Sequence, residues 1–128
     1  MTGKIILDSS VWISIHRKDL RICNLVLPLI EKRRVAVVDI IVAEVLRGCL
    51  TKQSSLQLLN GFTNFDIFTT DWLEVAELGY VVGRAGFNPP LADLYIAQSA
   101  IEEKLTVLTH DRHFLQIQEV APFKCELL

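Results

Sequence analysis

The sequence has no apolar run long enough to cross a membrane. Asp39, Glu44 and Arg84 interrupt the longest candidates, and none reaches the ~18 residues that a transmembrane helix requires. Near the start, a lysine precedes the short apolar run from Ile5 to Leu7, which Asp8 ends well short of a signal-peptide core. We therefore expect a soluble protein that resides in the cytoplasm and has no membrane partner.

Cysteine is scarce as well, and its pattern indicates no covalent framework. The chain contains three cysteines, Cys23, Cys49 and Cys125, and no CxxC motif. An odd number at wide spacing favours neither a disulfide framework nor a zinc site. We expect all of them to be buried free thiols.

The sequence also lacks a surplus of basic residues. The chain has 13 Lys and Arg against 15 Asp and Glu, which gives a formal net charge of −2. Proteins that bind nucleic acid usually carry a basic surface that attracts phosphate groups. If nucleic acid is the substrate, local basic groups or metal ions must offset the repulsion between this protein and the phosphates.

Apolar residues, in contrast, are abundant. They make up 51% of the 128 residues, against 22% charged residues, and this ratio excludes intrinsic disorder. A chain of this length predicts one domain over residues 1–128. So small a domain cannot bury all of its apolar surface, so we expect a homodimer.

Short segments rich in β-branched residues alternate with segments of helical periodicity. The expected strands are residues 4–7, 35–38, 65–69, 106–109 and 123–127. The expected helices are residues 11–15, after a tight turn at residues 9–10, and residues 20–30, 40–46, 51–60, 71–84, 91–104 and 111–120. Pro28 should strain the second helix, and Asp39 stands where an N-cap of the third belongs. The alternation predicts an α/β sandwich on a parallel sheet.

Two acidic residues follow strands of this sheet. Asp8 comes directly after the first strand, and Asp111 follows residues 106–109 with only His110 between. Ligands of open parallel sheets bind outside the carboxyl ends of the strands. If these two strands are neighbours, both carboxylates should project into the same crevice.

Two more acids lie within apolar helical segments. Glu44 and Asp93 have mostly apolar neighbours, where an unpaired charge would cost several kcal/mol. Arg47 and Arg84 could each pair with one acid, but these two arginines cannot neutralise all four acids. A divalent cation would satisfy the four acids together.

A purely structural interpretation exists for three of the acids. Asp8 and Asp111 could each cap the helix that follows, and Asp93 lies near the positive N-terminal end of its own helix. Glu44 has no such role. The four acids taken together favour a shared metal site. Because no His or Cys lies at a usable spacing, we expect Mg²⁺ or Mn²⁺ in this site and not zinc. Such an ion is suited to the hydrolysis of phosphate esters.

Four segments of the chain resemble a known family. They are Ile5-Ile6-Leu7-Asp8-Ser9-Ser10-Val11-Trp12-Ile13, Ala43-Glu44-Val45-Leu46-Arg47-Gly48, Leu91-Ala92-Asp93-Leu94-Tyr95-Ile96-Ala97 with Ala100, and Leu108-Thr109-His110-Asp111-Arg112-His113-Phe114. In order and spacing they resemble the PIN-domain nucleases, and within them the VapC-type toxins of toxin–antitoxin pairs. The resemblance spans nearly the whole chain. It implies a three-layer α/β/α sandwich with a central, mostly parallel sheet of four to five strands.

The resemblance also implies roles for particular residues. Asp8, Glu44, Asp93 and Asp111 correspond to an acidic quartet that binds Mg²⁺ or Mn²⁺ for the cleavage of single-stranded RNA. Ser9 corresponds to the position whose hydroxyl supports the quartet. The implied partners are an RNA substrate, a cognate VapB-like antitoxin and a second copy of the chain.

One residue departs from the family pattern. Many relatives have another acid two residues after the last quartet member, where this chain has His113. The substitution puts a second fully occupied metal site in doubt. His113 either contacts phosphate or has no chemical role, and the second interpretation is the more ordinary one.

Basic and apolar residues give weaker signals. Arg112, which adjoins Asp111, is the first choice for a phosphate contact, followed by Arg47 and Arg84, although most surface arginines are merely solvated. Arg17 and Lys18 belong to the same group. An antitoxin helix could lie on a groove made by Trp12, Leu20, Leu25, Leu56 and Leu59, although such stripes are more often core.

Three other functions remain open. The first is a housekeeping PIN-domain ribonuclease without an antitoxin. The second is an aspartyl-phosphate phosphatase or receiver-like domain. The sequence disfavours both, because Ser10 stands where the phosphatase needs a second acid and no lysine lies at the end of a late strand. The third is a metal-stabilised module that binds RNA or protein without catalysis.

Overall fold

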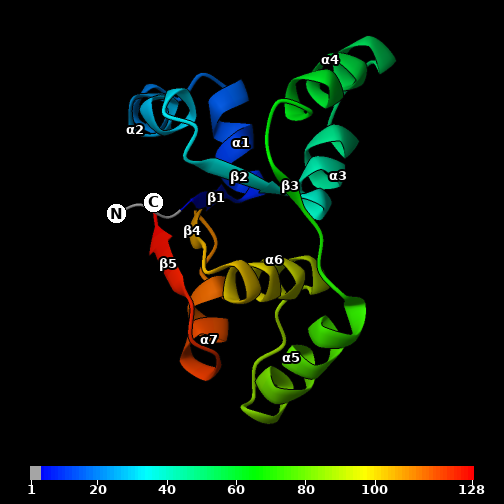
Figure 1. Ribbon diagram of the computed structural model, residues 1–128, viewed down its shortest axis with the longest axis vertical. Helices are drawn as coiled ribbons and strands as arrows, with labels where there is room; N and C mark the ends of the chain where they lie inside the picture. The colour runs from blue at the N-terminus through cyan, green and yellow to red at the C-terminus, as the bar shows by residue number, and fades with distance from the viewer. Residues whose placement is uncertain (1–3) are drawn as a thin grey trace.

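The computed structural model describes residues 4–128 and contains one five-stranded sheet (Figure 1). Every pair of neighbouring strands is parallel, in the order β3-β2-β1-β4-β5. The strands are β1 (Ile5–Leu7), β2 (Val35–Val38), β3 (Ile67–Phe68), β4 (Thr106–Thr109) and β5 (Lys124–Leu127). The helices are α1 (Ser9–His16), α2 (Leu20–Glu31), α3 (Asp39–Arg47), α4 (Lys52–Phe62), α5 (Trp72–Arg84), α6 (Leu91–Glu103) and α7 (His113–Val120).

The strand order explains how the helices form two layers. The chain moves from β1 through β2 to β3 in one direction, then crosses to β4 and continues to β5 in the other. Because crossovers between parallel strands are right-handed, the reversal places α1–α4 on one face and α5–α7 on the other. Figure 1 shows these two groups above and below the sheet. The expected three-layer α/β/α sandwich is confirmed.

The three central strands are buried along their whole length. β1 and β2 consist entirely of Ile, Leu, Val and Ala, and β4 is just as buried although it begins and ends with threonine, as expected for parallel strands covered on both faces. α6 is the most deeply buried helix, with a continuous buried segment from Asp93 to Ala97. The result is a rigid layer whose carboxyl edge positions the acids.

Several predicted boundaries were wrong by a few residues. The N-cap of α3 is Val38, whereas Asp39 is the first helical residue and accepts a hydrogen bond from the N–H of Ile40. β3 is only two residues long, because an edge strand with few partners stops pairing early. α7 begins at His113, because the side chain of Asp111 accepts the N–H of His113 just before the helix.

Two further expectations concern Pro28 and the cysteines. α2 continues through Pro28 without a break. The cysteines are free, as expected, but all of them are half-buried, so the expectation of full burial was wrong. Within residues 4–128, no helix is both long and apolar enough to span a bilayer.

Candidate functional site

The carboxyl ends of β1 and β4 lie side by side and bring Asp8 and Asp111 to one edge of the sheet. Leu7 is in register with Leu108, and the N–H of Asp8 donates to the Leu108 carbonyl at 3.0 Å. The Thr109 hydroxyl donates to Asp8 Oδ2 at 2.8 Å and accepts the N–H of Asp111 at 2.9 Å. The condition set from the sequence, that these two strands are neighbours, is therefore met.

Asp8 is a buried helix cap as well as a member of this edge. Only 3% of its surface is exposed. Its Oδ1 accepts the N–H of Ser9 at 2.8 Å, at the start of α1, and its Oδ2 accepts the Ser10 hydroxyl at 3.1 Å. The capping role weighed from the sequence is real, and it orients the carboxylate toward the other acids.

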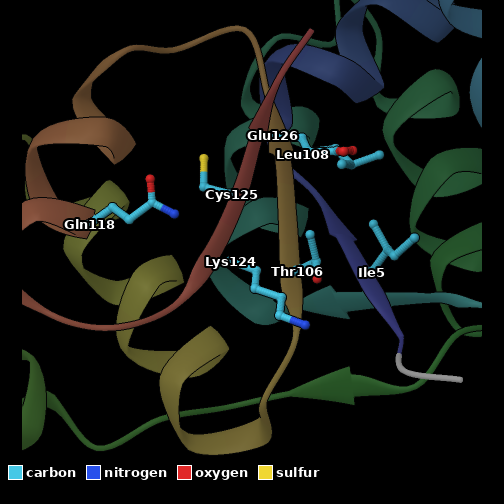
Figure 2. A pocket seen from close by; sticks show the side chains of 7 residues that line it. All are labelled: Ile5, Thr106, Leu108, Gln118, Lys124, Cys125 and Glu126. Carbon is cyan, nitrogen blue, oxygen red and sulfur yellow. The ribbon is translucent and has the colours of Figure 1, made fainter. Parts of the chain in front are cut away.

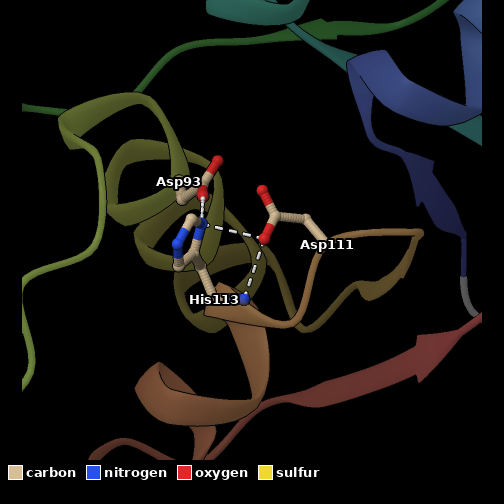
Figure 3. A group of neighbouring side chains, drawn as sticks. All are labelled: Asp93, Asp111 and His113. Carbon is tan, nitrogen blue, oxygen red and sulfur yellow. Dashed lines mark hydrogen bonds and ion pairs between the residues drawn. The ribbon is translucent and has the colours of Figure 1, made fainter.

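Asp93 and Asp111 meet at the side chain of His113 (Figure 3). The Nδ1 atom of His113 lies 2.8 Å from Asp111 Oδ1 and 3.3 Å from Asp93 Oδ2. The backbone N–H of His113 donates to the same Asp111 oxygen at 2.9 Å. Asp93, in the first turn of α6, is 7% exposed. Residues 93, 111 and 113 thus form a cluster whose ligand atoms lie within 4.8 Å of one another.

Glu44 reaches the same region from α3, which packs against both α1 and α6. Burial and the negative charge of Asp8 raise the pKa of Glu44, whereas a hydrogen bond from the Ser9 side chain and the charge of Arg47 lower it. Its Oε1 is buried and has no hydrogen-bond partner among residues 4–128. Ser9 therefore lies between two of the acids, at the place where a supporting hydroxyl was expected.

The electrostatics of Asp93 show that the four acids act on one another. Burial, together with the charges of Asp111, Asp8 and, more weakly, Glu44, raises the pKa of Asp93 to about 7. Only His113 opposes the shift. The structure thus brings together the four acids that the sequence singled out, and repulsion between them disfavours the fully ionised cluster without a cation.

Three helices begin at this cluster and partly offset the repulsion. Asp8 caps α1, Asp93 lies in the first turn of α6, and Asp111 immediately precedes the N-cap of α7. The N-terminal end of a helix carries a partial positive charge that stabilises carboxylates. Glu44 lies within α3, away from its N-terminus, and lacks this support.

The donor set fits a divalent cation. Glu44 Oε1 and Asp93 Oδ2 are buried oxygens without a hydrogen bond to any residue from 4 to 128. Leaving such oxygens unpaired is costly, and hard divalent cations bind carboxylate oxygens. Asp8, Glu44, Asp93 and Asp111 are the residues that could hold the ion.

Sequence reasoning missed two residues of this site. Thr109 ends a fully buried strand, and a hydroxyl at its carboxyl end, directly before His110 and Asp111, was the available signal. The statement that no histidine has a usable spacing was wrong, since His113 contacts two of the acids. Its signal was the Asp-x-His spacing at a helix start, which places both side chains at one helix end.

The three arginines chosen as phosphate contacts are exposed, and they differ in whether an acid of the cluster lies near them in the chain. Arg112 is the N-cap residue of α7, next to Asp111, and Arg47 lies one turn after Glu44. Arg84 ends α5 and is not among the charges that act on Asp93. No ion pair between Arg84 and Asp93 is found among the described residues, so the structure does not support that pairing.

The apolar groove expected on the first helices divides into two parts. Trp12 is buried and packs edge-on against Phe62 and Phe65, so it belongs to the core. The other members, Leu20, Leu25, Leu56 and Leu59, are exposed. A hollow of about 150 Å³ between α1 and α4 borders Trp12 and Phe62.

A second hollow, of about 400 Å³, lies beside β5 (Figure 2). It is lined by Ile5, Thr106, Leu108, Gln118, Lys124, Cys125 and Glu126. None of the four acids lines it. Burial and two nearby carboxylates raise the pKa of Cys125 to about 11, so this thiol is not an activated nucleophile.

Comparisons with known proteins agree with this architecture. A family model described as "PIN domain" matches residues 5–120. Curated protein sequences gave no significant match. The fold resembles that of VapBC2 from Rickettsia felis bound to a promoter DNA fragment, with a TM-score of 0.78 and 20% identity over 97% of this chain and 98% of that one.

Two other solved structures are similar. DNA-bound VapBC from Salmonella typhimurium gives a TM-score of 0.72 at 19% identity, covering 98% of each chain. FitAcB from Neisseria gonorrhoeae gives 0.67 at 25% identity, over 94% of this chain and 95% of that one. At identities of 19 and 20%, the likeness to the two VapBC structures shows a common fold and nothing finer.

Proposed function

The chain belongs to the PIN-domain family, and from the acid cluster that this fold assembles we propose that it is a metal-dependent endoribonuclease. The proposed reaction is the hydrolysis of phosphodiester bonds in single-stranded RNA, with Mg²⁺ or Mn²⁺ as cofactor. One observation carries the proposal. Glu44 and Asp93 each hold a buried carboxylate oxygen without a hydrogen-bond partner among residues 4–128, within one cluster of four acids.

In this proposal, Asp8, Glu44, Asp93 and Asp111 hold the cation. When bound, such an ion stabilises charge on phosphoryl oxygens and makes a water molecule more acidic. The hydroxyls of Thr109 and Ser10 fix the Asp8 carboxylate, at 2.8 and 3.1 Å. Ser9 donates its backbone N–H to Asp8, and its side chain partly offsets the raised pKa of Glu44, so Ser9 supports both acids.

The protein's own contribution to substrate binding comes from the rim of the cluster. Arg112 and Arg47 are exposed next to Asp111 and Glu44, where they can contact phosphates that flank the cleaved bond. Arg84 is the weakest member of this group, because it ends α5 and, unlike Arg112 and Arg47, adjoins none of the four acids along the chain. The net charge of −2 makes these local contacts and the cation necessary for binding RNA.

We propose further that the chain is the toxin of a toxin–antitoxin pair. The support is its likeness to VapBC and FitAcB, whose names denote two-component complexes. The exposed leucines of α2 and α4, Leu20, Leu25, Leu56 and Leu59, suit the apolar face of a VapB-like antitoxin helix. A separate exposed apolar set on α5, which includes Trp72, Leu73 and Tyr80, suits a second copy of the chain.

An RNA cleavage assay tests the proposed activity. The wild-type protein should cut single-stranded RNA with Mg²⁺ or Mn²⁺ and lose this activity in EDTA. Asp8→Asn and Asp93→Asn should abolish cleavage, because an amide is a poor ligand for a hard cation. Asp66→Asn is the matched control, since Asp66 is exposed and paired with Lys4.

The same assay separates the alternatives. A folded protein that binds Mn²⁺ and RNA without cutting would indicate a non-catalytic binding module. Cleavage that no co-encoded small protein inhibits would favour a housekeeping ribonuclease. Retention of near wild-type rates by Asp93→Asn would remove that residue from the site.

A further inference from the structure

We propose that His113 is a direct ligand of the divalent cation, together with Asp93 and Asp111, and that it makes the site prefer Mn²⁺ over Mg²⁺. The inference rests on the proposed function in one respect, namely that the acid cluster binds a divalent cation. It concerns a position where the family resemblance leads one to expect an acid.

The first argument is the spacing of the three ligand atoms. His113 Nδ1 lies 2.8 Å from Asp111 Oδ1 and 3.3 Å from Asp93 Oδ2. Adjacent ligands of an octahedral ion with metal–ligand bonds of about 2.1 Å are separated by about 3 Å. The observed distances lie on either side of this value. The imidazole nitrogen therefore occupies the place of a neighbouring ligand on an ion shared with both carboxylates.

The second argument is that these atoms lack other partners. Asp93 is more than nine-tenths buried, and its Oδ2 points toward the His113 ring (Figure 3). Neither this oxygen nor His113 Nδ1 makes a well-directed hydrogen bond to any residue in the range 4–128. Buried polar atoms without partners are rare in folded proteins, because leaving them unpaired costs free energy. A cation between them would satisfy both.

The third argument is local structure. His113 is the first residue of α7, and its backbone N–H is anchored on Asp111 Oδ1 at 2.9 Å. This anchor holds the ring over the two carboxylates with Nδ1 turned toward them, as Figure 3 shows. The His113 side chain keeps 45% of its surface exposed, so its outer edge meets solvent. The histidine is thus held in place before any ion binds.

The chemistry of the donor atoms sets the preference. Mg²⁺ favours a shell of oxygen ligands, whereas imidazole nitrogen suits later and softer divalent ions. For a given N/O site, Mn²⁺ and Zn²⁺ bind more tightly than Mg²⁺ because they accept a nitrogen donor better. Replacing an acid by His113 therefore shifts this site toward Mn²⁺ and Zn²⁺.

Metal-binding titrations test the proposal without any activity measurement. Dissociation constants for Mn²⁺ and Mg²⁺ are measured by calorimetry, with Mn²⁺ also followed by electron paramagnetic resonance. In His113→Asp, which restores an acid, the ratio of Mg²⁺ to Mn²⁺ dissociation constants should fall by about tenfold or more. His113→Gln should lose more affinity for Mn²⁺ than for Mg²⁺.

His16→Gln is the matched control, because His16 is exposed at the end of α1, outside the cluster. It should leave both constants unchanged. A ratio that is the same in the wild type, His113→Asp and His113→Gln would overturn the proposal.

A second measurement needs no variant of His113. In nitrogen NMR spectra of the wild-type protein, Zn²⁺ serves as a diamagnetic probe, and the chain offers three histidines to compare. The Nδ1 signal of His113 should shift on titration, whereas the ring signals of His16 and His110 should not. An unchanged His113 signal at saturating Zn²⁺ would contradict direct ligation.

These results are independent of RNA cleavage. A protein that shows the expected Mn²⁺ preference but cuts no RNA would contradict the proposed function and leave the role of His113 intact. A protein that cuts RNA while the His113 variants keep the wild-type metal ratio would contradict only the role of His113.

Discussion

The Thr109 hydroxyl donates to Asp8 Oδ2 at 2.8 Å, across two neighbouring strands. The oxygen of the Thr109 hydroxyl in turn accepts the backbone N–H of Asp111 at 2.9 Å. A single fully buried hydroxyl therefore fixes one acid through its side chain and positions the other through its main chain. The separation between two of the proposed metal ligands depends on it.

Thr109→Val should weaken both the site and the fold. Removing a buried hydrogen bond to a carboxylate costs about 1–3 kcal/mol of unfolding free energy, measured by chemical denaturation. Loss of a residue that orients a metal ligand should lower RNA cleavage by about tenfold or more. Thr109→Ser, which keeps the hydroxyl, should restore most of the activity. Thr106→Val, at the other end of β4, is the control and should leave cleavage unchanged.

Asp93→Asn should raise the melting temperature of the metal-free protein or leave it unchanged. The substitution removes a buried charge that Asp111 and Asp8 repel. Melting curves recorded in EDTA check this. A drop of several degrees would mean that the contact with His113 stabilises the ionised Asp93, so that its role is structural.

The stability of the metal-free protein should fall as the pH rises from about 4 to about 7. Burial and neighbouring acids raise the pKa of Asp93 from 3.8 to about 7, so the folded state holds this proton more tightly than the unfolded state. The penalty for ionising Asp93 is absent below the unfolded pKa, grows through the window and is complete above the folded value. The raised pKa of Glu44 acts in the same direction.

Melting temperatures in EDTA at pH 5 and pH 8 measure the effect, which we expect to be about 3–6 °C. Asp93→Asn should show a smaller difference between the two conditions. A wild-type protein that is more stable at pH 8 would show that other ionisable groups outweigh the cluster.

Lys104→Gly should stabilise the protein. Lys104 ends α6 in the left-handed conformation, with φ of 55°, where a side chain is strained and glycine is not. We expect a gain of about 0.5–1 kcal/mol in the free energy of unfolding. Glu103→Gly, one residue earlier and still helical, should instead lose stability. Equal effects of the two substitutions would contradict the argument.

The proposed homodimer predicts a specific response in sedimentation. The wild type should be a dimer at micromolar concentration, and Tyr80→Glu should favour the monomer, because it places a charge in the exposed apolar set of α5. Leu56→Glu, on α4, should leave the dimer intact and instead weaken binding of an antitoxin. A monomeric wild type would contradict the dimer and leave the proposed catalytic site untouched.

Most of the fold could be predicted from local patterns. The buried strands at 35–38 and 106–109 have the expected bounds, because short runs rich in β-branched residues, without polar alternation, are typical of central parallel strands. The predicted boundaries were wrong at helix starts, where a side chain can take the place of a backbone hydrogen-bond partner. Asp39 was expected to cap α3, but Val38 holds that position, because α3 begins directly after Val38, the last residue of β2 and the partner of Phe68.

The site was predicted in kind but not in detail. The sequence by itself determined which acids stand at the ends of strands and which lie in apolar helical segments. Both properties can be recognised from the residues that flank each acid. Their roles as metal ligands stay predictions. The sequence could not determine that β1 and β4 are neighbours, since residues 5–7 and 106–108 are separated by most of the chain.

Only the tertiary structure decided which groups meet. From the sequence, His113 was noted only as a departure from the family pattern, because its contacts with Asp93 of α6 and with Asp111 arise only in the folded chain. Thr109 gained its role because the sheet places it beside Asp8. Sequence patterns report how each residue relates to its own helix or strand, whereas the electrostatics of the site arise from contacts between elements that pack together only in the folded chain.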